Sequence, residues 1–216
     1  MRHPDGLRSA AAAGLPVIGA AYEGGFFAGY ISHTANSVAT HALIVAPAAT
    51  GASGTDYTIT TMLQLKTANT TTAGTTSNFN GAVNSAAMND ANHPAAQFCE
   101  GLSIGGYTDW YLPARYELDI AYQNLKQDTT SNSTSWGINA YAVPARTVER
   151  TAGAPAQTSV AAFQTGGAQA FIAGRHWSST EFSSTAGYLF DFIDGSMHDG
   201  DKTLTRRVRA FRKVAV

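Results

Sequence analysis

The sequence predicts an α+β fold that combines two main helices with short antiparallel strands and long loops. Two segments carry the boundary residues or the apolar spacing of helices, and short β-prone runs stand apart from them in the chain. The 21 Gly and 7 Pro, together with long Ser, Thr and Asn stretches, predict many turns between these elements. A chain of 216 residues is long enough for one compact core.

The first half of the chain predicts a β-hairpin. Residues 26–32 are aromatic and β-prone and follow two glycines, and residues 41–46 form an apolar run that ends at Pro47. We expect these two runs to pair, with Asn36 in the turn between them. A further strand is expected within residues 58–66.

The first of the two helices is expected at residues 93–102. Asn92 or His93 is placed to cap it, Pro94 fits its first turn, and Gly101 ends it. The second helix is expected next along the chain.

This second helix is expected at residues 114–126. Leu118, Tyr122 and Leu125 have the i, i+4, i+7 spacing of a single apolar face, and Pro113 stands at the first position. The apolar face predicts that this helix packs against the core.

Two polar segments, residues 67–84 and 127–155, show no apolar period. We expect surface straps whose order depends on contacts with the rest of the protein. A short helix is predicted at residues 160–164, with Ser159 as its cap and Gly166 at its end.

A strand is predicted at residues 188–194, where side chains would alternate between two faces. The inward face would hold Tyr188, Phe190 and Phe192. The outward face would hold Leu189, Asp191 and Ile193. Two readings follow: an exposed patch that binds a partner, or a strand that is buried on both faces.

The last strand is expected to turn Val208 and Ala210 to the core. Its other face would carry Arg207, Arg209, Phe211 and Lys213. The basic residues of this region, which also include Arg206 and Arg212, are expected to pair with nearby acids. The available acids are Glu181, Asp191, Asp194, Asp199 and Asp201.

The bulk charge argues against a nucleic-acid partner and against membrane insertion. The net charge is -1, and only 13% of the residues are charged, so the chain lacks the basic excess that phosphate contacts require. No apolar run approaches the length of about 18 residues that a membrane-spanning helix needs.

The sequence offers no catalytic constellation. The single cysteine, Cys99, excludes an internal disulfide and a cysteine zinc site, and we expect it to be buried on a helix. No nucleophile-elbow, zinc-protease or phosphate-loop motif occurs. Glu117 and Asp119 stand two apart on a helix and therefore do not face each other. We expect a protein that is not an enzyme, with His176 packed in the core.

The motifs resemble those of C-type-lectin-fold proteins that retroelements diversify, chiefly phage receptor-binding or tropism-determining proteins. The resemblance rests on residues 105–113 (GGYTDWYLP), Glu117-Leu118, residues 177–181 (WSSTE) and residues 208–212 (VRAFR). Formylglycine-generating-enzyme-like and Legionella-collagen-like domains share related motifs. The resemblance covers about residues 20–214 and implies a C-type-lectin-like fold.

In that family, adenine positions of a template are randomised, mostly in Asn codons. Such codons cannot reach Lys, Glu, Gln, Met or Trp. Between Phe182 and Arg206 only Met197 and Lys202 belong to this unreachable set. The pattern fits two fixed positions inside a variable tract.

The resemblance implies a division of the chain into a linker or arm at residues 1–20 and a ligand-binding domain at residues 21–216. The variable tract would cover about residues 175–207. The implied ligand-binding residues are Ala186, Leu189, Asp191, Ile193, Asp194, Ser196, His198, Asp199, Gly200, Asp201, Thr203 and Arg206. No catalytic residue and no metal ligand is implied.

The implied partner is a protein or glycan on a host or target cell, bound from a virion tail-fibre tip or a bacterial surface. No cofactor is expected, although a structural calcium ion stays possible, and a homo-oligomer such as a trimer is suggested by analogy with phage fibres. Two alternatives stay open. One is a structural tail or adhesin subunit that uses the same face as a subunit interface. The other is a formylglycine-generating-like enzyme, which the missing cysteine pair disfavours.

Overall fold

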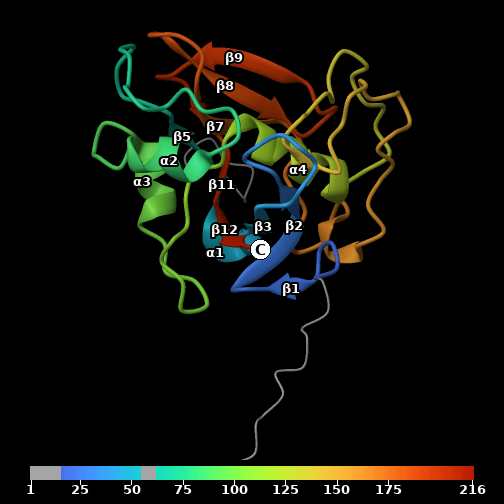
Figure 1. Cartoon of the computed structure of the whole chain (residues 1–216). Coiled ribbons are helices and arrows are strands. Elements are labelled where there is room, and N and C mark those ends of the chain that lie inside the picture. Colours follow the sequence, from blue (N-terminus) through green and yellow to red (C-terminus); the bar gives the residue numbers. More distant parts are fainter. Residues whose placement is uncertain (1–15, 55–61) are drawn as a thin grey trace, which may run out of the picture.

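The computed structural model describes residues 16–54 and 62–216. It confirms the α+β class, because 16% of the residues are helical and 28% are in strands. A five-stranded antiparallel sheet curls into a half-barrel at one end of the domain, and a three-stranded sheet lies at the other end (Figure 1). The long helix α4, Arg115–Leu125, lies between the two sheets and contacts both.

The five-stranded sheet confirms the predicted hairpin. Its strands are β1 (Ala21–Tyr22), β2 (Gly25–Ile31), β3 (His41–Val45), β6 (Ala142–Val143) and β12 (Phe211–Ala215). β2 pairs antiparallel with β3, and the side chain of Asn36 accepts a hydrogen bond from the amide of Val38 at 3.0 Å in the connecting turn. β12 pairs with the other edge of β3 and brings the end of the chain into the sheet.

The predicted arm at residues 1–20 is too long. The amide of Gly19 donates to the carbonyl of Phe27 at 2.8 Å, and the amide of Phe27 donates to the carbonyl of Ala20 at 3.0 Å. Ile18 packs against the core. Residues 18–20 therefore belong to the domain, and residues 1–15 of the arm lie outside the described residues.

The three-stranded sheet corrects the predicted strand at residues 188–194. Its strands are β7 (Arg175–Glu181), β8 (Ala186–Asp191) and β9 (Met197–Asp201). Residues 192–194 form a turn, because the carboxylate of Asp191 accepts the amide of Ile193 at 2.9 Å and ends the strand. The Asp- and Gly-rich composition of β9 hid that strand.

Two small ladders join distant segments to this end of the domain. β10 (Thr205–Arg206) pairs with β5 (Leu63–Gln64), and β11 (Val208–Arg209) pairs with β4 (Ala52–Ser53). β5 is the described part of the strand that was predicted at residues 58–66. Residues 58–61 of that prediction lie outside the described residues.

The short helices match the predictions in part. α3 (Pro94–Glu100) begins at Pro94 and ends at Gly101, but the side chain of His93 makes no capping bond; its ring lies 2.8 Å from Asp90. α2 (Gly81–Ala86) was missed inside the first polar segment, because it lacks an apolar period. The described chain also contains α1 (Ala48–Gly51).

The predicted helix at residues 160–164 is one turn of 3₁₀ helix, Ala161–Phe163, and no side chain caps it. The second polar segment, residues 127–155, is irregular as predicted, apart from the two residues of β6. Gly166 and Gly167 follow this segment and prevent a longer helix, so a single 3₁₀ turn fits the sequence.

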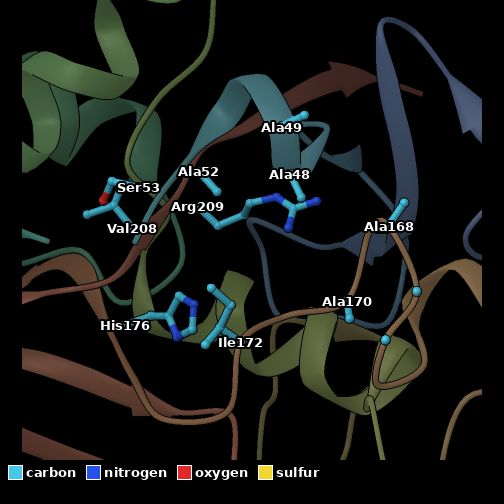
Figure 2. Close-up of a pocket in the computed structure, with 12 residues that line it drawn as sticks. Ala48, Ala49, Ala52, Ser53, Ala168, Ala170, Ile172, His176, Val208 and Arg209 are labelled. Carbon is cyan, nitrogen blue, oxygen red and sulfur yellow. The ribbon is translucent and has the colours of Figure 1, made fainter. Parts of the chain in front are cut away.

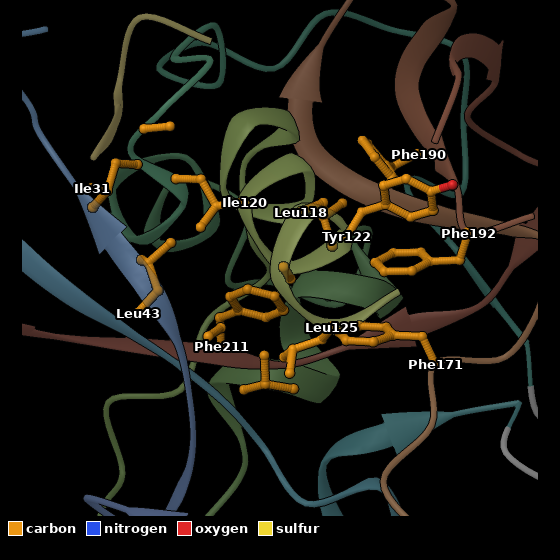
Figure 3. Packing of buried hydrophobic residues seen from close by; sticks show 14 of the residues in the cluster. Ile31, Leu43, Leu118, Ile120, Tyr122, Leu125, Phe171, Phe190, Phe192 and Phe211 are labelled. Carbon is orange, nitrogen blue, oxygen red and sulfur yellow. The ribbon is translucent and has the colours of Figure 1, made fainter. Parts of the chain in front are cut away.

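α4 carries the larger core, which Figure 3 shows on both sides of the helix. Leu118, Tyr122 and Leu125 are buried, as their spacing predicted. On the side of the three-stranded sheet, the ring of Tyr122 lies 5.6 Å from that of Phe190 and 6.0 Å from that of Phe192. Pro113 precedes the N-cap residue instead of opening the helix as predicted.

A second core lies beside α3. Trp110 and Trp177 are fully buried there, and Cys99 packs with them, which confirms the prediction for this thiol. The indole of Trp177 donates to the carbonyl of Leu63 at 2.9 Å, and that of Trp110 donates to the carbonyl of Tyr107 at 3.1 Å. Both indole N–H groups are thus satisfied inside apolar surroundings.

Glu117 connects three parts of the fold. Its carboxylate accepts the amides of Gly81 at 3.2 Å and Ala114 at 2.8 Å, and the hydroxyl of Tyr111 at 2.9 Å. An added Cβ at Gly81 would lie 2.3 Å from that carboxylate, so glycine is needed for the approach. Burial raises the pKa of Glu117 to about 7, against the hydrogen bonds that lower it.

The arginines near the end of the chain correct two predictions. Arg212 pairs with Asp109 at 2.8 Å and lies 3.4 Å from Glu23, neither of which is among the predicted acids. Arg209 and Phe211 are buried, although the alternation placed them on the outer face. Arg209 ends β11 and Phe211 begins β12, and the chain is covered on both faces where these two strands meet.

Asp119 holds the second polar segment to α4. Its carboxylate is fully buried and contacts the guanidinium groups of both Arg146 and Arg150. The side-chain amide of Asn139 donates to the same carboxylate at 2.7 Å. Arg150 also donates to the carbonyl of Gly195 at 2.7 Å, which links this cluster to the turn between β8 and β9.

Replacing Asp119 should destabilise the protein strongly. Asp119→Ala leaves the buried guanidinium of Arg150 and the half-buried one of Arg146 without their carboxylate, and breaking a buried pair in this way costs about 3–5 kcal/mol. Urea denaturation should show this loss. Glu149→Gln, at an exposed acid of the same segment, is the control and should change the free energy of unfolding by less than about 0.5 kcal/mol. Equal effects of the two variants would contradict the assigned role of Asp119.

His176 packs in the core, as predicted, among aromatic rings. Its ring centroid lies 4.8 Å from that of Phe192 and 6.1 Å from that of Phe171. Its Nδ1 lies 3.0 Å from the carbonyl of Gly174. Burial, with a smaller contribution from the nearby cations of Arg207 and Arg209, lowers the pKa of His176 to about 3, against the hydrogen bond to Gly174 that raises it.

This histidine should make the protein less stable in acid. Between pH 6.5 and 4 the unfolded chain binds a proton at His176 that the folded protein does not, so stability falls as the pH falls, by about 3 kcal/mol for this group. His176→Phe should remove that part of the loss. Unfolding by urea at pH 7 and pH 4.5 measures it, and an unchanged pH dependence in the variant would contradict the assignment.

Candidate binding surface

The structure divides the twelve predicted binding residues into buried, half-buried and exposed groups. Buried are Ala186, Leu189, Asp191 and Ser196. Half-buried are Asp194, His198, Gly200, Thr203 and Arg206. Exposed are Ile193, Asp199 and Asp201. They occupy β8, β9 and the turns at both ends of β9, which form one end of the domain (Figure 1), except Arg206, which lies in β10.

The outward orientation predicted for Leu189 is wrong. Leu189 pairs with Trp177 across the sheet, and its side chain is fully buried in the second core. On the neighbouring strand, an added Cβ at Gly200 would lie 2.6 Å from Leu189, so Gly200 covers it closely. Apart from the half-buried Tyr188, β8 is therefore buried on both faces, which is the alternative that the sequence left open.

Two of the predicted ligand-binding residues are acids that form the turn after β8. Asp191 is buried, accepts the amide of Ile193, and lies 3.6 Å from Arg175. Asp194 accepts both the amide of Ser196 at 2.9 Å and its hydroxyl at 2.6 Å. These bonds fix the turn that presents Ile193.

Close packing against α4 also holds this turn in place. Gly195 has a φ of 76°, and an added Cβ would lie 2.5 Å from the ring of Tyr122. Glycine is therefore required here both by the backbone conformation and by the contact with α4. With the bond from Arg150 to its carbonyl, Gly195 ties the turn to the core.

Lys202 anchors the far end of β9. Its ammonium group is buried and donates to the carboxylate of Glu181 at 2.8 Å, to the carbonyl of Thr70 at 3.0 Å and to that of Ser184 at 3.1 Å. Glu181 also accepts the amide of Thr72 at 2.8 Å. The buried pair thus fastens the first polar segment to the three-stranded sheet, which confirms that tertiary contacts order this strap.

Burial separates the two kinds of position in β9 and the turn after it. Met197 and Lys202, the residues that randomised Asn codons cannot encode, are 4% and 1% exposed. His198, Asp199 and Asp201, which lie between them, are half-buried or exposed. The two anchors are therefore structural, and the residues between them are displayed.

The acidic residues of the tract bond their own turns. Asp201 accepts the amide of Thr203 at 2.8 Å and its hydroxyl at 2.6 Å, and it also accepts the side-chain amide of Asn69 at 2.9 Å. Within residues 16–54 and 62–216, no group of three or more His, Cys, Asp or Glu side chains is arranged to hold a metal ion.

The surface also has an aromatic part that the sequence did not predict. Tyr188 is half-buried instead of inward, and the ring of exposed Phe182 meets its edge at 5.2 Å. The guanidinium of Arg115 lies 4.3 Å from the ring of Tyr188 and 4.7 Å from that of Tyr116. Arg115 comes from the start of α4, and no local pattern in the sequence connects it with β8.

A recess of about 180 Å³ adjoins this aromatic part. Arg115 and Tyr116 line it from α4, Met197 from β9, and Trp136, Ile138 and Glu149 from the second polar segment. Aromatic faces beside one cation and one anion suit ligands that are partly apolar and partly hydrogen bonding. The recess extends the surface beyond the predicted residues.

No protein-family model matches the chain, and no curated protein matches it in sequence. No helix in the described part of the chain has the length and apolar character needed to cross a membrane.

Substitution of a buried anchor and of a displayed residue should have unequal effects on stability. Lys202→Met should cost about 3 kcal/mol, because it leaves the buried carboxylate of Glu181 without its cation. Asp199→Ala, at an exposed position of β9, should change stability by less than about 0.5 kcal/mol. Chemical denaturation of both variants is the measurement. If Asp199→Ala destabilised the protein and Lys202→Met did not, the assignment of Lys202 as an anchor and Asp199 as a displayed residue would be wrong.

Proposed function

We propose that this protein is a C-type-lectin-like binding protein that displays a diversified surface to a protein or glycan on another cell. The observation that carries the proposal is the separation within β9 and the turn after it: the two residues that adenine randomisation cannot encode are buried anchors, and the residues between them are displayed. A diversified tract needs this arrangement, because changes at displayed positions leave the fold intact.

The way the surface is held supports the same function. The β8–β9 turn is fixed by Asp191, Asp194 and the bond from Arg150 to Gly195, and the end of β9 is fixed by Lys202. Binding to a rigid backbone loses little conformational entropy, so side chains can change while affinity is retained.

The displayed side chains suit a macromolecular ligand. Exposed Ile193 and Phe182 supply apolar area, Tyr188 and Arg115 supply a stacked aromatic and cationic pair, and Asp199 supplies an acid. Such a mixture of aromatic, apolar and charged groups on a fixed scaffold is typical of recognition surfaces. We place the protein on a virion tail-fibre tip or a bacterial surface, where such binding serves attachment.

A triple variant tests the location of the binding surface. Ile193→Ser, Asp199→Ser and Phe182→Ser together should reduce binding of the labelled protein to susceptible cells at least tenfold, because they remove displayed groups and no anchor. Flow cytometry over a panel of bacterial strains measures binding, and circular dichroism confirms that the variant stays folded.

The matched control replaces two exposed valines outside this surface, Val38→Ser and Val83→Ser, and should bind like the unchanged protein. Equal binding by the triple variant would move the site elsewhere. Failure of the unchanged protein to bind any strain, with residues 186–206 buried between copies in solution, would favour the structural-subunit alternative.

A further inference from the structure

Arg209 and Lys213 lie on successive strands, β11 and β12, and no acid in the described part of the chain pairs with either of them. Figure 2 shows Arg209 beside a cavity of about 310 Å³, where its Nε donates to the carbonyl of Ala46 at 2.7 Å and one Nη donates to the side-chain oxygen of Gln169 at 3.4 Å. A guanidinium keeps its proton and does not act as a nucleophile. Lys213 carries an amine, which is a nucleophile once it is uncharged.

The amine of Lys213 contacts the side-chain amide of Asn80. Its Nζ lies 2.5 Å from Oδ1 of Asn80. Because a C=O bond is about 1.2 Å long, the amide carbon Cγ lies no more than about 3.7 Å from Nζ. This is close to the separation of about 3–3.5 Å at which two atoms are positioned to react. The two residues are 133 positions apart in the sequence, so the fold brings them together.

The fold also fixes the amide of Asn80. Asn80 is the N-cap residue of α2, and its Oδ1 accepts the backbone amide of Val83 at 3.4 Å. The next residue, Gly81, donates its amide to the buried carboxylate of Glu117 at 3.2 Å. A backbone N–H that is directed at a carbonyl oxygen stabilises the negative charge that develops there when a nucleophile attacks the carbon.

The surroundings of Lys213 favour the uncharged amine. The residue is half-buried, and burial lowers its pKa, against the carboxylate of Glu117, which raises it. Two histidines lie near the amine, because burial and then the charge of Lys213 lower the pKa of both His33 and His41. Desolvation beside other basic groups is a common way in which proteins make a lysine nucleophilic.

We propose that Lys213 and Asn80 form an isopeptide bond in the folded protein. The uncharged Nζ of Lys213 attacks Cγ of Asn80, so that an Nζ–Cγ bond forms and the Cγ–Nδ2 bond breaks. One proton passes from Nζ to Nδ2, which leaves as ammonia. The products are a secondary amide between the two side chains and one molecule of ammonia, and the step needs no oxidant and no cofactor.

The cross-link would join the first polar segment, residues 67–84, to the strand that ends the chain. The pair of Lys202 and Glu181 fastens the same segment to the three-stranded sheet. A covalent link between distant residues restricts the unfolded chain, as a disulfide does. The bond would therefore make the domain resist unfolding, and it does not depend on which ligand the displayed surface binds.

Mass spectrometry of the purified whole chain tests the bond. The intact mass, measured after denaturation, should be lower than the sequence mass by one ammonia molecule. Trypsin cleaves after Lys66, Arg115 and Arg212, so the bonded protein should yield a branched peptide that joins residues 67–115 to residues 213–216. The full sequence mass without any branched peptide, after long incubation of the folded protein, would overturn the proposal.

Variants separate this reaction from another loss of ammonia. Lys213→Met removes the nucleophile and Asn80→Ala removes the amide, so each variant should keep its full sequence mass. The control is Asn78→Ala, two positions before Asn80 in the same tryptic peptide, which should lose ammonia like the unchanged protein.

Asn80 precedes Gly81, and an Asn-Gly pair can also lose ammonia when the side chain closes a succinimide ring with its own backbone. An ammonia loss that persists in Lys213→Met would belong to that ring closure and would overturn the proposal. The branched peptide of the unchanged protein decides the question even where a variant fails to fold.

Discussion

The buried carboxylate of Asp119 is the contact on which the displayed end of the molecule depends. It gathers Arg146 and Arg150 from a long irregular segment, and Arg150 in turn holds the carbonyl of Gly195. Without this cluster only the two residues of β6 would hold the segment by regular secondary structure, and the β8–β9 turn would lose the hydrogen bond from Arg150 to Gly195. A surface turn is thus positioned by charges that water does not reach, where ion pairs are strong because screening is weak.

The same design recurs at the other end of β9, where Lys202 and Glu181 hold the first polar segment. Both anchors use backbone carbonyls or amides as additional partners, so they specify the path of the chain and do not depend on the side chains displayed above them. This helps to explain how a surface rich in Asp, Gly and Ser stays rigid: buried charges order it together with the apolar side chains of β8 that pack in the core.

The sequence predicted those elements whose burial follows a local period. α4 was recognised from Leu118, Tyr122 and Leu125, and the first hairpin from its β-prone runs. Leu189 was misjudged because the groups that cover it, Trp177 and Gly200, come from other strands. α2 lacks any apolar period, and the burial of Arg209 depends on a distant segment, where the carbonyl of Ala46 accepts a hydrogen bond from its Nε. Tertiary contacts of this kind leave no local pattern.

The two ends of the described chain enter the same sheet. Residues 18–20 bond to β2, and Val216 donates to the carbonyl of Thr40 at 3.2 Å, both in the five-stranded half-barrel. The three-stranded sheet lies at the opposite end of the domain (Figure 1). A tether, label or fused partner joined at either end of the described chain would therefore leave β8 and β9 accessible to a ligand. The domain is thus suited to the display of variant libraries on a solid support.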